Sequence, residues 1–338
     1  MPVRTGLQRA GTALRPSCRD GEIPPRRTGP GMTQMNDPRL VCLGNLTIDD
    51  VVLPDGSERP GCTGGDALYA CFAARLFEPR TEMVAPVGSD WPASTSLQIR
   101  TAGLSEAGLP PRDIPSLHNR VAYDADGGRI WTLFNGDDAF HTLSPTVADI
   151  PQSFLKAEIF LILAMTLEAQ VDLVAGLKDR PGSLVALDMQ EDYIRGNEQV
   201  LRNLIGRCDI FMPSADEAQQ LLGHQDWDAA ARTFADLGPQ VVVLKLGGDG
   251  VLVHDRAADR MIRVPPFPGQ VVDTTGAGDS FCGGFLAALL QDRGDLESAA
   301  RAGAVAAAFA VSDYGADPMF KAEPGEARRR LQAWRDAP

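Results

Sequence analysis

Residues 271–290, VVDTTGAGDSFCGGFLAALL, combine a glycine turn, an acid and a long apolar run. The small residues at 276–278 allow a ligand to approach the backbone closely. Phe281, Phe285 and Leu289 recur at a four-residue spacing, which predicts a helix that begins near Gly278. The first amides of such a helix lack partners and lie at the positive end of its dipole. They can therefore hold an anionic phosphate oxygen.

Asp279 stands directly after this turn. A helix N-terminus favours the carboxylate form, so Asp279 is expected to be ionised and able to accept a proton. A base beside an anion site is what transfer of a phosphoryl group to a hydroxyl requires. The same residues also fit a simpler interpretation, in which Asp279 only caps the helix and the glycines only form a turn.

Elements that alternate along the chain must position these residues. The apolar runs of strand length are 39–46, 81–90, 158–165, 183–189, 208–214 and 240–248, and the helical patterns between them include 66–77, 167–179, 197–207 and 215–223. This alternation predicts an α/β fold with a mostly parallel sheet that is covered on both faces and binds its ligand beyond the carboxyl ends of the strands. Residues 48–65 and 119–137 read as β-hairpins, the second joined at DADGG, and are expected to form a small lid over the cleft.

Composition excludes several classes of protein. The chain has 338 residues, of which 44% are hydrophobic and 23% charged, as is typical of a soluble globular protein. A net charge of −13 argues against binding nucleic acid or anionic lipid by bulk electrostatics, and no apolar run reaches the ~18 residues that span a bilayer. Six scattered cysteines indicate free thiols in the cytoplasm, and the dispersed histidines predict no structural zinc site.

The N-terminal segment differs from the rest. Residues 1–36 are rich in Arg, Pro and Gly and have no apolar period, so they are predicted to be a disordered extension of a domain at 37–338. The start of translation could be Met1, Met32 or Met35.

The stretch DTTGAGDSFCGGFLAAL closely resembles the C-terminal signature of the ribokinase family, the PfkB sugar and nucleoside kinases. Further landmarks follow in the family's order across roughly residues 39 to 335. The resemblance implies a doubly wound α/β fold with a small β-sheet lid, inserted at about 50–63 and 118–136. It also implies ATP with Mg²⁺ as the donor, and phosphorylation of a hydroxyl group of a sugar or related small molecule.

The resemblance also assigns residues to the reaction. Asp279 falls on the catalytic base, and Gly276, Ala277 and Gly278 fall on the anion hole with Thr275. The matching motifs GNLTIDD and GGDALYA place the substrate at Asp49, Gly64, Gly65 and Asp279. The implied nucleotide-binding residues are Ser214, Glu217, Lys245, Gly247, Gly250, Thr275, Gly276 and Gly278.

Two ion sites follow from the resemblance. Glu217 would organise Mg²⁺ through water, and Asp188 in ALDMQ would lie near the phosphates. A potassium site is implied at Asp273, Thr275, Ala310 and Gly315. Lids of two subunits often pair in this family, so a homodimer through the lid is expected. Trp131 and Phe134 are expected in the hairpin core rather than on a substrate ring.

Three positions depart from the family pattern. Ser214 stands where the family's Asn-x-x-Glu motif has Asn, Tyr69 stands where the Gly-Gly motif is followed by Asn, and Met319 replaces a small hydroxyl residue near the cation site. Two other hypotheses remain. One is a hydroxymethylpyrimidine or pyridoxal kinase on the same fold, and the other is a kinase-derived binding protein without turnover. The hairpins and the GAGD turn argue against the first, and Asp279 argues against the second.

Overall fold

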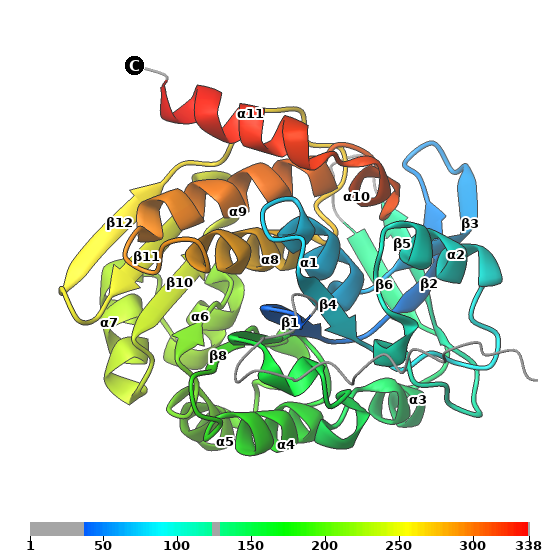
Figure 1. Ribbon diagram of the computed structural model, residues 1–338, viewed down its shortest axis with the longest axis horizontal. Coiled ribbons are helices and arrows are strands. Elements are labelled where there is room, and N and C mark those ends of the chain that lie inside the picture. Colours follow the sequence, from blue (N-terminus) through cyan, green and yellow to red (C-terminus); the bar gives the residue numbers. More distant parts are fainter. Residues whose placement is uncertain (1–36, 124–128, 337–338) are drawn as a thin grey trace, which may run out of the picture. The chain divides into compact units, whose positions relative to one another are not determined.

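The computed structural model describes residues 37–123 and 129–336. Its larger sheet has eight strands in the order β12-β11-β10-β9-β8-β7-β1-β4 (Figure 1). In chain order these strands are β1 (Leu40–Leu43), β4 (Thr81–Val84), β7 (Ile159–Ile162), β8 (Leu184–Leu187), β9 (Ile210–Phe211), β10 (Val241–Lys245), β11 (Val251–Asp255) and β12 (Arg260–Val264). The strands from β10 to β4 run parallel, and β11 and β12 extend the sheet antiparallel.

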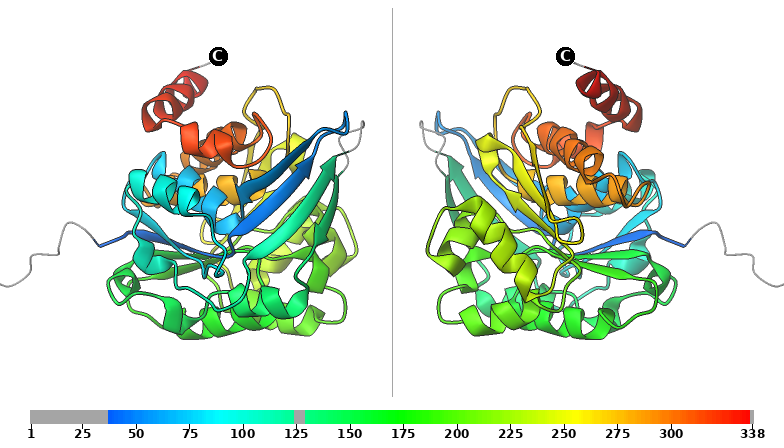
Figure 2. Two further views of the ribbon diagram at one scale, coloured as in Figure 1. Left: turned by 90° about the vertical axis from the view of Figure 1, so that its right-hand side faces the viewer. Right: turned by 90° about the vertical axis from the view of Figure 1, so that its left-hand side faces the viewer.

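Helices cover both faces of this sheet, as the apolar strands predict (Figure 2). One layer contains α1 (Asp66–Arg75), α8 (Ala277–Leu289), α9 (Leu296–Ala310) and α11 (Pro324–Arg335). The other contains α4 (Leu167–Leu177), α5 (Glu198–Ile205), α6 (Ala215–Leu222) and α7 (Trp227–Leu237). Strand β1 shows why two layers form, because Leu40 and Cys42 pack into the first core whereas Val41 and Leu43 pack into the second. Three further α-helices are α2 (Ala93–Thr101), α3 (Asp137–Leu143) and α10 (Asp317–Lys321).

Helix α8 is wedged between α1 and α9. A Cβ atom on Gly283 would lie 2.0 Å from the carbonyl oxygen of Ala70 in α1. On the opposite side, a Cβ atom on Gly284 would lie 2.6 Å from the Cβ atom of Ala306 in α9. Two adjacent glycines therefore let three helices pack closely, and they fix the position of the helix that follows the glycine turn.

A second sheet of four strands has the order β3-β2-β5-β6. It consists of β2 (Thr47–Val52), β3 (Glu58–Gly64), β5 (Leu117–Tyr123) and β6 (Arg129–Leu133), and is called the lid below. The two antiparallel hairpins match those expected at 48–65 and 119–137, and β2 pairs with β5 in parallel. The DADGG turn, like the extension at 1–36, lies outside the described residues. Trp131 and Phe134 are 48% and 55% exposed, so the expectation that they lie in the hairpin core is wrong.

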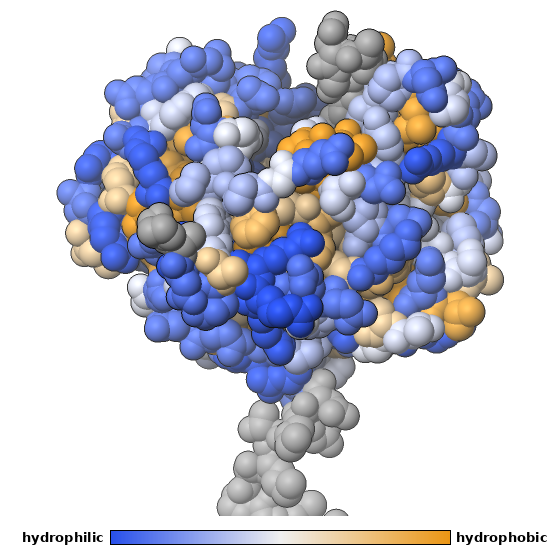
Figure 3. All heavy atoms as spheres, turned by 90° about the horizontal axis from the view of Figure 1, so that it is seen from above, coloured by the Kyte–Doolittle hydropathy of each residue, from blue (hydrophilic) through white to orange (hydrophobic). Residues whose placement is uncertain are grey.

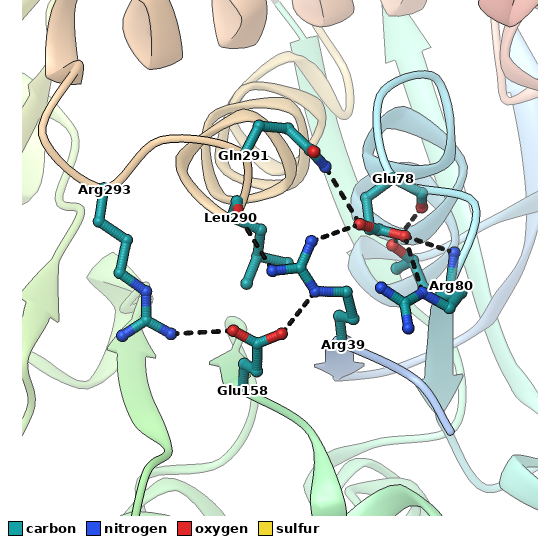
Figure 4. A network of polar contacts seen from close by, with 8 residues as sticks. Arg39, Glu78, Arg80, Glu158, Leu290, Gln291 and Arg293 are labelled. Carbon is teal, nitrogen blue, oxygen red and sulfur yellow. Dashed lines mark hydrogen bonds and ion pairs between the residues drawn. The ribbon is translucent and has the colours of Figure 1, made fainter. Parts of the chain in front are cut away.

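An ion-pair network ties the amino ends of the strands together (Figure 4). Arg39, just before β1, donates to Glu78 (2.9 Å) after α1 and to Glu158 (2.5 Å) before β7. It also donates to the carbonyl oxygen of Leu290 (3.0 Å) at the end of α8. Gln291 donates to Glu78 as well (3.1 Å). This network lies at the end of the sheet opposite the carboxyl ends, where the ligand is expected.

The surface above α9 and α11 is mainly hydrophilic, with small separate hydrophobic patches (Figure 3). Within residues 37–123 and 129–336, no helix is both long and apolar enough to cross a membrane.

Candidate active site

The glycine turn leads directly into α8. Gly276 is the N-cap and has a left-handed backbone (φ 72°), and Asp279 lies in the first turn of the helix, close to the predicted start. Glycine is required at 276 because a Cβ atom there would lie 2.3 Å from the ring of Tyr69. The Tyr69 side chain is 2% exposed and supports the turn from beneath. The structure thus combines a helix N-terminus, a turn of small residues and a carboxylate.

A lysine lies against the other side of the turn. Lys245, the last residue of β10, places its Nζ 2.5 Å from Oδ2 of Asp188, which follows β8. The same Nζ lies 3.4 Å from the position of a Cβ atom on Gly278 and 3.7 Å from Sγ of Cys282. Burial alone would lower the pKa of Lys245, but the charge of Asp188, the charges of Cys282 and Glu217, and the hydrogen bond to Asp188 together raise it. A permanent positive charge therefore adjoins the expected phosphate site.

Ser214 and Glu217 open α6 with a reciprocal cap. The Ser214 amide donates to Oε2 of Glu217 (2.7 Å), and the Glu217 amide donates to the Ser214 hydroxyl (3.2 Å). Serine thus has a local role where the family has asparagine. Burial, followed by the Asp188 charge, raises the pKa of Glu217 to about 8. A divalent cation nearby would favour its ionised form.

The arrangement fits a hydrated magnesium ion. The part of the chain that the structure describes has no group of three or more His, Cys, Asp and Glu side chains placed to hold a metal. Magnesium keeps several waters and commonly uses one or two carboxylates together with substrate phosphates. Glu217 suits that mode of binding. Asp188 is near enough that its charge, after burial, contributes to the raised pKa of Glu217.

The predicted substrate residue Asp49 lies in β2 and is buried, with 8% of its surface exposed. Its Oδ1 accepts a hydrogen bond from Nδ2 of Asn119 (2.9 Å) in β5. Gly64 adjoins it, because a Cβ atom there would lie 2.0 Å from Oδ2 of Asp49. Burial raises the pKa of Asp49 to about 6, although Asn119 and Thr47 donate hydrogen bonds to it. Gly65 follows as the N-cap of α1, so the structure brings three of the predicted substrate residues together: Asp49, Gly64 and Gly65.

Sequence reasoning missed Asn119. Its side chain is 1% exposed, and its Oδ1 has no hydrogen-bond partner within the described residues. The same holds for Oδ1 of Asn45, which follows β1. Buried acceptors without donors are rare, and they suit a ligand that carries hydroxyl groups. No local pattern could reveal Asn119, because it meets Asp49 from 70 residues away.

A second carboxyl group lies beside Asp279. Asp66, the first residue of α1, accepts a hydrogen bond from the Asn45 amide (2.6 Å). Burial, followed by the charge of Asp279, raises the pKa of Asp66. Asp66 is therefore biased toward its neutral form. The sequence did carry a signal, since the acid directly follows Gly64 and Gly65.

Asp273 lies where the resemblance implies a potassium site. It is 3% exposed, and its Oδ1 accepts hydrogen bonds from the Tyr123 hydroxyl (2.5 Å) and the Thr275 amide (2.7 Å). Its Oδ2 accepts a longer one from the Gly315 amide (3.3 Å). Ala310 ends α9 nearby. Three donors surround this carboxylate, and Gly315 directs its amide toward it, so the arrangement does not fit a monovalent cation at Asp273.

Gly247 and Gly250 form the turn between β10 and β11, and both have positive φ angles. They follow Lys245 at the carboxyl end of its strand. The predicted residues thus form two groups, one around Lys245 and Glu217 and one around Asp49. Burial raises the pKa of both Asp66 and Tyr69, and the charge of Asp279 adds to each shift, so Asp279 lies near the group around Asp49.

Comparisons with known proteins identify the family and the fold. Residues 62–322 match the description "pfkB family carbohydrate kinase". The chain is 31% identical over 280 residues to a cytidine kinase of Thermococcus kodakarensis, covering 82% of this chain and 97% of that protein. It is 27% identical over 300 residues to a ribokinase of Haemophilus influenzae, covering 82% and 93%.

Solved structures share the fold. A ribokinase from Giardia lamblia superposes with a TM-score of 0.74 at 18% identity, covering 88% of this chain and 99% of that one. A nucleoside kinase of Burkholderia thailandensis in complex with inosine gives 0.71 at 19% identity, covering 87% and 97%. A putative ribokinase II from E. coli in complex with ATP and Mg²⁺ gives 0.71 at 20% identity, covering 88% and 99%. The fold is ribokinase-like, and the chain belongs to the pfkB family of carbohydrate kinases.

Proposed function

We propose that this kinase transfers the γ-phosphoryl group of ATP to a hydroxyl group of a sugar or nucleoside, with Asp279 as the general base. As a member of its family, the chain is a phosphotransferase with an alcohol group as acceptor. The observation that carries the mechanism is the position of Asp279 in the first turn of α8, immediately after the turn at 276–278.

The proposed step balances in atoms and charge. Asp279 takes the proton of the acceptor hydroxyl, the hydroxyl oxygen bonds to the γ-phosphorus, and the bond from that phosphorus to the β-phosphate oxygen breaks to release ADP. The N-terminus of α8 and the amides of the 275–278 turn take up charge on the phosphoryl group. Lys245 adds a positive charge behind Gly278.

ATP and Mg²⁺ are the donor pair in this proposal. Glu217 would hold the ion through water, and the bound ion would neutralise phosphate charge. The structural relative from E. coli was solved with this pair.

The acceptor is proposed from the pocket and from the relatives. Oxygen atoms that can accept hydrogen bonds lie where the substrate hydroxyl groups are expected, on Asp49, Asn119 and Asn45. They suit a polyhydroxylated molecule. Relatives include enzymes called cytidine kinase, ribokinase, nucleoside kinase and deoxyribokinase. A panel of cytidine, inosine, ribose and deoxyribose with ATP and Mg²⁺, measured as ADP release, would identify the class. A binding protein without turnover would bind one of them and release no ADP above the rate without acceptor.

The Asp49→Asn variant is expected to lower kcat/KM for the acceptor roughly 10- to 100-fold, the equivalent of a hydrogen bond to a charged group. The KM for ATP should stay within about twofold, since ATP binds at other residues.

In the wild type, kcat/KM for the acceptor should fall below about pH 6. There Asp49 becomes protonated and can accept fewer hydrogen bonds from the hydroxyl groups of the acceptor. Initial rates from pH 5 to 8 test this, and an acid limb that persists unchanged in Asp49→Asn would contradict it.

The effect of pH on stability through Asp49 should be opposite to its effect on kcat/KM, because protonated Asp49 favours the folded state. The folded protein retains a proton on Asp49 between its ordinary pKa and about 6, where the unfolded chain has lost it. The contribution of Asp49 to the free energy of unfolding therefore falls as pH rises through this window. The substitution to Asn should remove that slope.

We also propose a homodimer through the lid. Strand β6 is an open edge of the lid sheet, and it carries Ile130 and Trp131 at 72% and 48% exposure. Exposed apolar side chains on an edge strand indicate an interaction surface. Trp131→Glu should convert a dimer to a monomer in light scattering at micromolar concentration. Val171→Glu, on an exposed position of α4, should leave the dimer intact, and a wild-type monomer would refute the proposal.

A further inference from the structure

We infer that the Tyr123 hydroxyl is a positioning group that holds the anion-binding turn in shape from the lid, in the place where a monovalent cation would otherwise act. The kinetic part of this inference rests on the proposed function. The structural part does not, and it can be tested without turnover.

The Tyr123 hydroxyl joins the lid to Asp273 and Thr275, which precede the glycine turn at 276–278. Tyr123 is the last residue of β5, and its hydroxyl lies 2.5 Å from Oδ1 of Asp273 and 2.7 Å from Oγ1 of Thr275. The phenol has a single proton, which goes to the carboxylate, so the Thr275 hydroxyl donates to Tyr123. The Thr275 amide donates to the same Oδ1 (2.7 Å). The Tyr123 hydroxyl and the Asp273 carboxylate thus both hold Thr275, the residue that directly precedes Gly276.

Asp273 depends on these donors. Its carboxylate is buried, and no Lys, Arg or His within residues 37–123 and 129–336 forms an ion pair with it. Its negative charge is compensated by the donors of Tyr123, Thr275 and Gly315. Removing one donor from a buried carboxylate is costly, so the loop should shift or recruit another partner.

The ring of Tyr123 is held independently of its hydroxyl. It packs edge-on against Tyr314, with the ring centroids 5.1 Å apart at 67°. Arg59 of β3 lies over the same Tyr314 ring at 5.5 Å, and it pairs with Asp313 at 3.4 Å. Both lid hairpins therefore contact the loop at 313–315. Loss of the hydroxyl alone should leave the lid in place but release the turn.

These contacts couple two events that catalysis needs together. The lid carries Asp49 and Asn119, which face the acceptor, and the turn faces the phosphate. When the lid covers the acceptor, Tyr123 reaches Asp273 and Thr275 and sets the turn. The enzyme should therefore need no potassium, because the hydroxyl compensates the carboxylate that a cation would compensate.

The first test measures hydrogen exchange in the protein without nucleotide. Tyr123→Phe removes the hydroxyl and keeps the ring, and amides in a peptide spanning 273–279 should exchange roughly tenfold faster than in the wild type. Tyr314→Phe is the matched control, since it preserves the ring pair and removes a hydroxyl that does not touch Asp273; its exchange should equal the wild type. Equal exchange in Tyr123→Phe and the wild type would overturn the inference.

The second test uses turnover of the acceptor found with the panel. Tyr123→Phe should lower kcat roughly 10- to 100-fold with both KM values within about twofold, because the turn binds charge that develops in the transition state. Wild-type rates in potassium chloride and in tetramethylammonium chloride should agree within about twofold, and potassium should raise the rate of Tyr123→Phe. A wild type that requires potassium, or an unchanged kcat in Tyr123→Phe, would refute the role. Absence of turnover with every acceptor would instead refute the proposed function, and the exchange result would still decide the contact.

Discussion

The Asp279→Asn variant is expected to fold and to bind ATP, but to turn over roughly 10²–10⁴ times more slowly than the wild type. Asp279 lies in the first turn of α8 rather than at the N-cap, so a neutral amide removes only its interaction with the helix dipole, about 0.3–1 kcal/mol, and α8 should still form. The amides of the 275–278 turn are unaltered, so the KM for ATP should change little. The amide cannot take the proton from the acceptor hydroxyl, and kcat alone should fall. Steady-state kinetics and a melting temperature on one preparation test both statements.

Asp295→Asn provides the matched control. Asp295 is also an acid at a helix N-terminus, where it caps α9 by accepting a hydrogen bond from the Ser298 amide (2.9 Å). Asp295→Asn should change kcat by less than about twofold and the free energy of unfolding by less than about 0.5 kcal/mol. If Asp279→Asn behaves in the same way, the Asp279 carboxylate only stabilises the N-terminus of α8, and the proposed mechanism is wrong.

The Lys245→Met variant is expected to lose about 3–5 kcal/mol of free energy of unfolding, the usual effect of breaking a buried ion pair. Methionine fills a similar volume but leaves Asp188, whose side chain is 4% exposed, without its cation. Urea denaturation measures the loss. The double variant Lys245→Met/Asp188→Asn should recover much of it, because no buried charge then lacks a partner.

An exposed pair on the same chain sets the scale for comparison. Lys321 pairs with Asp317 at 3.2 Å, but the two side chains are 74% and 69% exposed. Lys321→Met should therefore cost at most about 0.5 kcal/mol. A similarly small loss in Lys245→Met would show that the Lys245–Asp188 pair does not stabilise the fold.

The parallel strands and the helices next to them could be predicted from the sequence, because each has a strong pattern of its own. Continuous apolar runs such as 158–165 correspond to strands buried on both faces, and β7 lies within that run. The antiparallel strands β11 and β12 were not predicted, since LKLGGDG alone gives only a weak hairpin signal. The alanine-rich α9 was also missed, because its buried residues occupy almost every side and give no clear stripe.

The residues of the candidate site also fall into two groups, those with a local sequence pattern and those that only folding brings together. The turn at 276–278, Asp279 and Asp49 stand in motifs that are contiguous in sequence, so the sequence alone was enough to predict them as site residues. Asn119 and Tyr123 were missed as site residues because their partners lie 70 and 150 residues away, at Asp49 and Asp273. Only the position of the lid over the strand ends brings them together. Contacts made by folding, rather than by local pattern, therefore carry the features that set this chain apart.

The packing of α8 has an evolutionary consequence. Gly283 and Gly284 leave no room for side chains between α8 and its neighbours α1 and α9, so the helix has little freedom to slide or rotate. The base and the anion site are then at one place for every acceptor. The residues that we propose to contact the acceptor, Asp49 and Asn119, belong instead to strands of the lid. Selection can exchange one acceptor for another by altering the lid, without disturbing the helix that performs the transfer.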